Sequence, residues 1–365
     1  MMGGKVYIIA EAGVNHNGNI EIAKELVRKG AEAGVNAVKF QTFKPEHLVT
    51  RTVEKAEYQK VTTGNQESQL EMLKKLTLQA RDYVELEQLC KECDVDFIST
   101  PFDSDSLHFL ITELDMPFIK IPSGEITNAP FLLEIAHTHK SVMLSTGMAT
   151  LGEVEQALEV LAYGYLCEDF PSDFQMIHNA FVSEKGQNIL KKKVRLLHCT
   201  TQYPAPLYQV NLNAMETMTK AFGVPVGYSD HTEGIIIPIA AVAKGAVVIE
   251  KHFTLDKNME GPDHKASLEP DELKNMVQGI RIVERAIGNG IKIPVPAELP
   301  NIHIARKSLV AAKDIEEGEV LSRENLTAKR AGEGISPMDM WFILGRKTSR
   351  SYVKDEIIKM IDVCE

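Results

Sequence analysis

Eight short apolar runs recur between residues 6 and 254, and this recurrence constrains the fold more than any other feature of the sequence. The runs cover residues 6–13, 37–43, 95–102, 118–124, 141–147, 194–200, 225–231 and 247–254. Amphipathic helical patterns lie between most of them, such as residues 20–34 with Ala23, Leu26 and Val27 on one face. Strands that alternate with helices predict a parallel sheet with crossover helices. Because the runs are almost continuously apolar, as in strands buried on both faces, we expect an α/β protein that closes into a (β/α)8 TIM barrel.

A doubly wound open sheet is the alternative architecture for the same alternation of elements. Its nucleotide-binding version needs a G-x-G-x-x-G turn after the first strand, and no such turn follows residues 6–13. The barrel is therefore the favoured interpretation.

The sequence predicts two domains and a linker. Residues 1–288 form the catalytic barrel and end in a helical pattern. Residues 289–304 contain the run IKIPVPAELPN, whose prolines stiffen the chain and are expected to exclude a helix. Residues 305–365 are typical of short strands and turns, and predict a small β-rich module. About sixty residues bury only a modest core, so we expect this module to lean on the barrel of its own or a neighbouring subunit.

Charge and hydropathy argue against nucleic-acid and membrane partners. The formal net charge of −11 opposes the binding of a polyanion, and there is neither a signal peptide nor an apolar stretch of membrane-spanning length. Cys90 and Cys93 belong to an odd set of five cysteines and continue an apolar helix face. We therefore expect buried, reduced thiols and a cytoplasmic protein.

Two spacers between predicted strands are unusually long. Residues 44–76 are predicted to form a substrate-covering loop, because long insertions after barrel strands often do. Residues 163–193 are interpreted as a surface excursion without a role in the site.

Polar side chains gather at the carboxyl ends of the predicted strands, where barrel enzymes hold their catalytic groups. Lys39 and Lys120 lie inside apolar runs, where a lysine is costly to desolvate unless an anion meets it. Hydroxyl groups follow at neighbouring strand ends, from Thr100, Ser123 and Ser145. Together these groups predict a cradle for a phosphate and a carboxylate. The alternative is that the lysines form internal salt bridges with glutamates of the same rim, namely Glu11, Glu125 or Glu250.

Two histidines, His231 and His252, end consecutive strands and could meet over one sector of the rim. Such a pair suits a divalent metal, with manganese, iron and zinc all compatible with the ligand type. The remaining histidines, His47 among them, are interpreted as surface or structural. An anion site beside a metal indicates a Lewis-acid carbonyl reaction of a phosphorylated small molecule. An aldolase, an epimerase and a phosphoenolpyruvate condensing enzyme all remain open.

The sequence resembles the sialic acid synthase family in an ordered set of segments that spans almost the whole chain. The segments are EAGVNHNG, VKFQTF, STPFD, KIPSGEITN, STGMATLGE, LHCTTQYPAP, GYSDHTEG, EKHFTLD and GPDHKASLEP. The tail KSLVAAKDIEEGEVLSRENLTAKRAGEGIS resembles that family's antifreeze-like (SAF, β-clip) module. The order of the segments makes the resemblance specific.

The resemblance implies a synthase that condenses phosphoenolpyruvate with an N-acylated amino sugar and water, with C–O cleavage and release of phosphate. It assigns phosphoenolpyruvate to Lys39, Thr100, Lys120, Ser123, Ser145 and Ser229, and the sugar to Gln41, Tyr203, Asp263 and Arg330. It assigns catalytic roles to Glu11, Glu125, Lys120, His231 and His252. The two histidines would hold a divalent metal, typically Mn²⁺, with Mg²⁺ and Co²⁺ as alternatives. It further implies a domain-swapped homodimer, in which Arg330 of one subunit's C-terminal module contacts the sugar in the other barrel.

Departures from the family pattern bear on the sugar. Thr201 and Gln202 replace the Asn-Ile that precedes Tyr-Pro in many neuraminate-making members, and Ala331 stands where a proline is usual. The stretch KAEYQKVTTGNQESQLEML resembles the legionaminate-making branch, which takes 2,4-diacetamido-2,4,6-trideoxymannose rather than N-acetylmannosamine. A metal-dependent pyruvate aldolase and a non-catalytic sugar-binding protein on the same barrel are the competing hypotheses.

Overall fold

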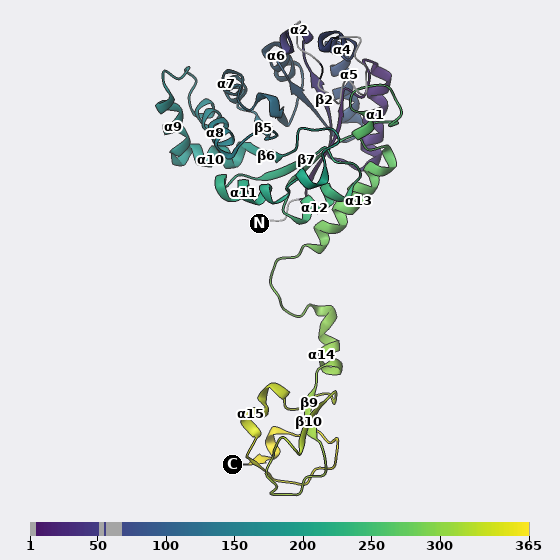
Figure 1. The fold of residues 1–365 in the computed structure, drawn as a ribbon, viewed down its shortest axis with the longest axis vertical. Helices are drawn as coiled ribbons and strands as arrows, with labels where there is room; N and C mark the ends of the chain where they lie inside the picture. The colour runs from purple at the N-terminus through teal and green to yellow at the C-terminus, as the bar shows by residue number, and fades with distance from the viewer. Residues whose placement is uncertain (1–4, 51–54, 56–67, 365) are drawn as a thin grey trace. The chain divides into compact units, whose positions relative to one another are not determined.

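The computed structural model describes residues 5–50, 55 and 68–364, and it joins the eight predicted strands in one parallel sheet (Figure 1). The strands are β1 (Tyr7–Gly13), β2 (Ala37–Thr42), β3 (Asp96–Pro101), β4 (Phe118–Ile121), β5 (Ser141–Ser145), β6 (Val194–His198), β7 (Val226–Asp230) and β8 (Val248–His252). Strand β1 pairs with both β2 and β8, so the first and last strands meet. The hydrogen-bonded order runs from β3 through β1 and β8 to β4, and β3 and β4 are neighbours. This nearly closed sheet confirms the TIM barrel, and the doubly wound alternative is wrong.

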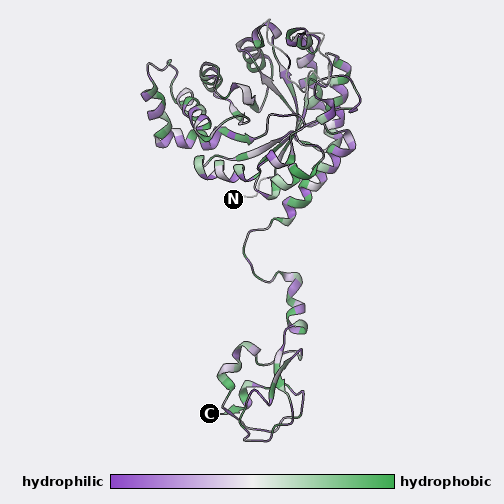
Figure 2. Ribbon diagram, viewed as in Figure 1, coloured by the Kyte–Doolittle hydropathy of each residue, from purple (hydrophilic) through white to green (hydrophobic). Residues whose placement is uncertain are grey.

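Helices follow the strands and surround the sheet (Figure 1). They are α1 (Ile20–Ala33), α2 (Pro45–Leu48), α4 (Gln69–Lys75), α5 (Ala80–Glu92), α6 (Ser104–Glu113), α7 (Ala129–His137), α8 (Leu151–Leu166), α9 (Phe174–Val182), α10 (Glu184–Lys193), α11 (Asn213–Phe222), α12 (Ile236–Ala243) and α13 (Pro270–Ala286). A capping box opens α8, where Thr150 and Glu153 satisfy each other's backbone N–H groups. Gly34 ends α1 in a left-handed conformation that favours glycine. Figure 2 shows hydrophobic and hydrophilic residues alternating along these helices, as expected when one face packs on the sheet.

The interior of the barrel changes from apolar to polar along the strands. The inward side chains in the layer further from the carboxyl ends of the strands are apolar and buried. They include Ile9, Ile98, Met143, Leu197 and Val248. Two residues further along each strand or just past its end, the next inward side chains are Glu11, Thr100, Ser145, Cys199 and Glu250. The period of two therefore places an apolar plug below a polar chamber at the carboxyl ends of the strands.

The C-terminal unit, Asn289–Glu365, is compact and has its own core. In it β9 (Ser308–Ala311) pairs antiparallel with β10 (Leu326–Lys329), and β11 (Lys347–Thr348) pairs with β12 (Val363–Cys364). A short helix, α15 (Met340–Ile343), adds Ile343 to the core. The unit is β-rich, as predicted.

The expectation that prolines exclude a helix from residues 289–304 is wrong. A 3-10 turn at Pro296–Glu298 leads directly into α14 (Leu299–Ala305). Pro300 lies in the first turn of α14, where the missing N–H has no partner to lose and the fixed φ suits a helix.

Both long spacers between the predicted strands contain helices. The described part of residues 44–76 forms α2 and α4, which contact each other, whereas residues 51–54 and 56–67 lie outside the described residues. The second spacer, 163–193, continues α8 and adds α9 and α10, which pack on it.

No helix within the described ranges is long and apolar enough to cross a membrane.

Candidate active site

A cavity of about 320 Å³ opens at the carboxyl ends of the strands. Twelve predicted site residues line it: Glu11, Lys39, Gln41, Thr100, Lys120, Ser123, Ser145, Tyr203, Ser229, His231, His252 and Asp263. They come from all eight strands or from the residues just after them, apart from Asp263, which lies in a later loop. The alternation of inward and outward side chains thus gathers groups that are far apart in the chain.

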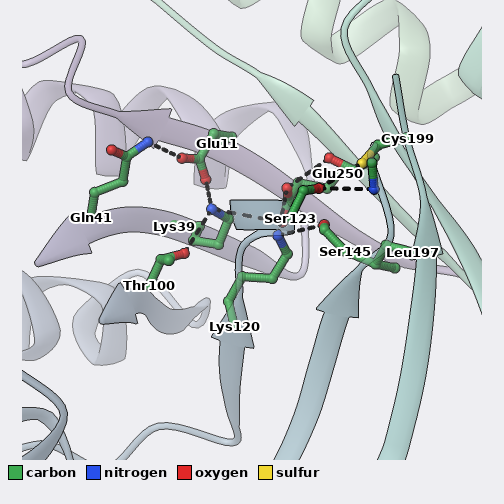
Figure 3. Close-up of polar contacts among 12 residues, drawn as sticks. Glu11, Lys39, Gln41, Thr100, Lys120, Ser123, Ser145, Leu197, Cys199 and Glu250 are labelled. Carbon is green, nitrogen blue, oxygen red and sulfur yellow. Dashed lines mark hydrogen bonds and ion pairs between the residues drawn. The ribbon is translucent and has the colours of Figure 1, made fainter. Parts of the chain in front are cut away.

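Both lysines are buried and lie among carboxylates and hydroxyls (Figure 3). Lys39 Nζ forms an ion pair with Glu11, lies 3.7 Å from Glu250 Oε2 and donates to Thr100 Oγ1 at 3.3 Å. Lys120 Nζ donates to Ser145 Oγ at 2.8 Å and lies 3.4 Å from Glu250 Oε1. The lysines therefore form internal salt bridges with Glu11 and Glu250, as the alternative interpretation held, and the same ammonium groups line the cavity where an anion would enter.

The charges in this network shift one another's pKa values. Burial raises the pKa of Glu11 despite the opposing charge of Lys39. Burial also acts to raise the pKa of Glu250, but Lys120 and Lys39 outweigh it and hold that pKa at about 2. Burial lowers the pKa of Lys120, and Glu250 only partly offsets the effect. The pKa of Lys39 is raised, because the charges of Glu11 and Glu250 exceed its desolvation. Glu250 is therefore a fixed anion, whereas Glu11 is the carboxyl more easily protonated.

Hydroxyl and backbone donors complete the side of the cavity near β4 and β5. Ser123 Oγ accepts a hydrogen bond from Gly147 N at 3.0 Å and lies 3.2 Å from the Cys199 thiol. Ser229 Oγ donates to Glu250 Oε1 at 2.9 Å. An anion bound here would meet two buried ammonium groups and several O–H groups, and such charge-assisted contacts are strong.

The rings of His231 and His252 meet edge to face with centroids 5.5 Å apart, and both are buried. His231 Nδ1 lies 2.6 Å from the carbonyl oxygen of Thr200. A carbonyl only accepts, so Nδ1 carries the proton, and Nε2 accepts from the Tyr203 hydroxyl at 3.1 Å. Within the described chain, His252 Nδ1 has no hydrogen-bond partner.

Burial keeps both imidazoles neutral. It lowers the pKa of His231 to about 4 and lowers the pKa of His252 well below its usual value, with the charge of His231 adding to the second shift. Two neutral rings that line one cavity, one of them held by a carbonyl behind it, fit a divalent transition metal. The donor set therefore agrees with the metal that the sequence predicts.

A second group of potential ligand atoms lies outside this cavity. His47, Asp103 and Asp105 bring one ligand atom each within 4.8 Å of one another, the only such group of three found in the described ranges. Asp103 already accepts the Ser106 N–H at 2.8 Å as the cap of α6, and Asp105 pairs with Lys44 at 2.5 Å. These contacts give the acidic residues a structural role.

Within the barrel unit, one predicted site residue, Glu125, is not among those that line the cavity. Glu125 ends a 3-10 turn after β4 and accepts a hydrogen bond from Asn128 Nδ2 at 2.6 Å. Arg330 is exposed and follows β10 in the C-terminal unit.

Sequence reasoning missed two kinds of cavity residue. Cys199 follows β6 directly, so the strand-end rule that found the other residues could have found it. The apolar residues of the α2–α4 segment carry no chemical signal, although they line the cavity beside Gln41: Leu48, Val49, Met72, Leu73 and Leu76.

Comparison with known proteins is consistent with this geometry. A sequence model of the NeuB family matches residues 26–292, and one of the SAF domain matches residues 306–363. The chain is 51% identical to the N,N'-diacetyllegionaminic acid synthase of Campylobacter jejuni, over 97% of this chain and 99% of that protein. It is 46% identical to the protein of the same name from Legionella pneumophila, over 94% and 90%. The structure of an N-acetylneuraminic acid synthetase from Leptospira borgpetersenii superposes with a TM-score of 0.67 at 30% identity, covering 82% of this chain and 90% of that one.

Proposed function

The chain belongs to the NeuB family, and we propose that it condenses phosphoenolpyruvate with an N-acylated amino sugar and water to give a nine-carbon nonulosonic acid and phosphate. One observation supports the proposal above all others. A single cavity holds two buried lysines with hydroxyl groups beside two neutral histidines. Such a cavity suits a trianionic substrate and a carbonyl partner.

Phosphoenolpyruvate would bind on the β2–β5 side of the cavity. Its phosphate and carboxylate would take Lys39 and Lys120 as counter-ions, with hydroxyl donors from Thr100, Ser123, Ser145 and Ser229. Glu11 and Glu250 keep the lysines charged and in place before the substrate arrives, which lowers the cost of organising the site.

His231 and His252 would hold a divalent cation, with Mn²⁺ as the first candidate. When bound, it would supply Lewis-acid polarisation of the sugar aldehyde. Thr200 fixes the ring of His231 for this purpose through its carbonyl oxygen.

In the reaction, C3 of phosphoenolpyruvate forms a bond to the aldehyde carbon of the open-chain sugar, and the aldehyde oxygen takes up a proton. Water adds at C2 and loses a proton, after which the C2–O bond to phosphate breaks. Two cavity carboxyls have raised pKa values, Glu11 and Asp263, each chiefly through burial. Asp263, with a pKa of about 7, is suited to give the proton to the aldehyde oxygen, and Glu11 to accept one from water. Glu125 remains a further candidate for the water step.

We propose 2,4-diacetamido-2,4,6-trideoxymannose as the preferred sugar, which gives N,N'-diacetyllegionaminate, with N-acetylmannosamine as the alternative. The apolar side chains of the α2–α4 segment offer a surface for a C6 methyl group rather than a hydroxyl. The identity to two legionaminate-making relatives supports the same choice.

The C-terminal module would complete the site in a homodimer. Arg330 of one subunit would contact the N-acyl group of a sugar in the partner's barrel, and the protein would act in the cytoplasm. Residues 1–288, 289–304 and 305–365 would serve as catalytic barrel, linker and capping domain.

An isotope experiment separates this reaction from its nearest rival. Phosphoenolpyruvate labelled with ¹⁸O in the bridging oxygen should release labelled phosphate only when sugar and metal are present, because the C–O bond breaks. Turnover of pyruvate with the sugar would instead identify an aldolase, and an absence of turnover with either donor would leave a sugar-binding protein.

A further inference from the structure

Behind the two histidines lies a fully buried ion pair that the reaction does not use. The side chains of Asp230 and Lys251 have no exposed surface, and Lys251 Nζ lies 2.7 Å from Asp230 Oδ2. The two residues pair in register across β7 and β8. Each directly precedes one of the histidines, His231 or His252.

The pair lies on the outer side of the barrel wall. Ser229 and Glu250, one residue earlier on each strand, line the cavity and are bonded to each other at 2.9 Å. Because side chains alternate along a strand, Asp230 and Lys251 point away from the cavity while the histidines return to it.

The other hydrogen bonds of this pair lead to Thr232 and Tyr228, which lie close to His231 in the chain. Lys251 Nζ also donates to the carbonyl oxygen of Thr232. Asp230 Oδ1 accepts from Thr232 N at 3.0 Å, and Asp230 Oδ2 accepts from Thr232 Oγ1 at 3.1 Å. Tyr228 Oη donates to Asp230 Oδ1 at 3.0 Å. The residues on both sides of His231 are therefore fastened to the residue beside His252.

A gain in folding stability does not by itself explain why the protein buries this ion pair. Desolvating two opposite charges costs about as much as their attraction returns, and an apolar pair of similar volume often replaces them without loss. A fully bonded ion pair does, however, fix geometry, because each partner accepts few other arrangements.

We propose that Asp230 and Lys251 are positioning residues that set the distance and orientation between His231 and His252, and so the affinity of the metal site. The inference rests on the proposed metal centre. If it is correct, removing the pair leaves the barrel folded but weakens the binding of the metal.

The test is a titration of the full-length protein with Mn²⁺, followed through the electron paramagnetic resonance signal of the free ion, beside thermal unfolding. The double variant Asp230→Asn with Lys251→Met leaves no unpaired buried charge. It should unfold within a few degrees of wild type yet bind Mn²⁺ at least tenfold more weakly. Lys251→Arg, which keeps the charge, should stay within about threefold. Glu159→Gln removes one partner of the Glu159–His178 pair between α8 and α9 and should not change Mn²⁺ affinity.

The outcomes distinguish the inference from its premise. A folded double variant that binds Mn²⁺ within twofold of wild type overturns the positioning role alone. Wild-type protein that binds no Mn²⁺, or binds it equally well as His231→Ala, overturns the metal centre and the inference with it. If the double variant does not fold, Thr232→Val removes only one hydroxyl from the network, and unchanged affinity in that variant also overturns the proposal.

Discussion

Burial and neighbouring charges together shift the pKa values of several side chains in the cavity. His231 and His252 are neutral, Glu250 stays charged, and Asp263 has a pKa near neutrality. The sequence predicted that His231, His252 and Glu250 would lie at one rim, because the carboxyl ends of parallel strands meet there, whereas only the family resemblance assigned Asp263 to the site. It did not predict which carboxylates would pair with the lysines. Glu11 and Glu250 lie near the carboxyl ends of β1 and β8 and Glu125 follows β4, and only the packing of the barrel decides that Glu125 stays out of the cavity.

Asp263 predicts a pH dependence of stability. Burial, with a smaller effect of Glu11, raises its pKa from 3.8 to about 7. Between these values the folded protein holds a proton that the unfolded chain has lost, so stability falls as pH rises through this window and levels off above it. Asp263→Asn removes this dependence. We expect wild type to lose on the order of 2–3 kcal/mol more than the variant between pH 5 and pH 8, measured by denaturant unfolding of the barrel. Equal losses would mean that the carboxyl has an ordinary pKa.

At the level of elements, the strands could be predicted from the sequence and the helices of the spacers could not. Eight apolar runs carry a clear signal, and each observed strand lies within its predicted run. The helix α14 was not predicted, because prolines were expected to exclude a helix, whereas a proline in the first turn of a helix does not interrupt it. The segments α2 and α4 were expected to cover the substrate, and their described residues do line the cavity. Their apolar character there follows from tertiary packing on Val14 and Phe43, which a local pattern does not reveal.

The apolar cavity residues of the α2–α4 segment predict that Val49→Thr changes the preference between the two sugars. The two side chains have nearly the same shape, so the exchange replaces a methyl group at the cavity wall with a hydroxyl. Placing a hydroxyl against an apolar methyl of the sugar costs about 1 kcal/mol, or roughly fivefold in kcat/KM for the 6-deoxy sugar. The value for N-acetylmannosamine should fall less. A steady-state comparison of both sugars checks this, and an equal loss for both would remove Val49 from the recognition of C6.

At the scale of the whole molecule, the chain consists of a barrel that holds the chemistry and a small unit with its own core. The order of the family segments implied both units, and matches to the NeuB family and the SAF domain bear this out. The role proposed for the small unit depends on assembly, because Arg330 of one subunit would act on the sugar in the partner's barrel. Its test must therefore combine two subunits.

Arg330→Ala should raise the KM for the sugar by ten- to a hundredfold and leave the KM for phosphoenolpyruvate within twofold, because a charged hydrogen bond contributes about 1.5–3 kcal/mol. Arg323→Ala is the matched control, since Arg323 lies over the Trp341 ring of the same unit. Mixing subunits of Arg330→Ala and His231→Ala should restore activity if the module acts on the partner's barrel. A mixture no more active than its components would refute the exchange between subunits.

The central claim is tested most directly by phosphate release from phosphoenolpyruvate with two sugars assayed side by side. In the presence of Mn²⁺, we expect release with 2,4-diacetamido-2,4,6-trideoxymannose at a kcat/KM at least tenfold above that with N-acetylmannosamine, a difference of about 1.4 kcal/mol or more. Release should stop when the metal is chelated. An enzyme that releases no phosphate with either sugar, with Mn²⁺ supplied and the protein folded, would contradict the proposed function.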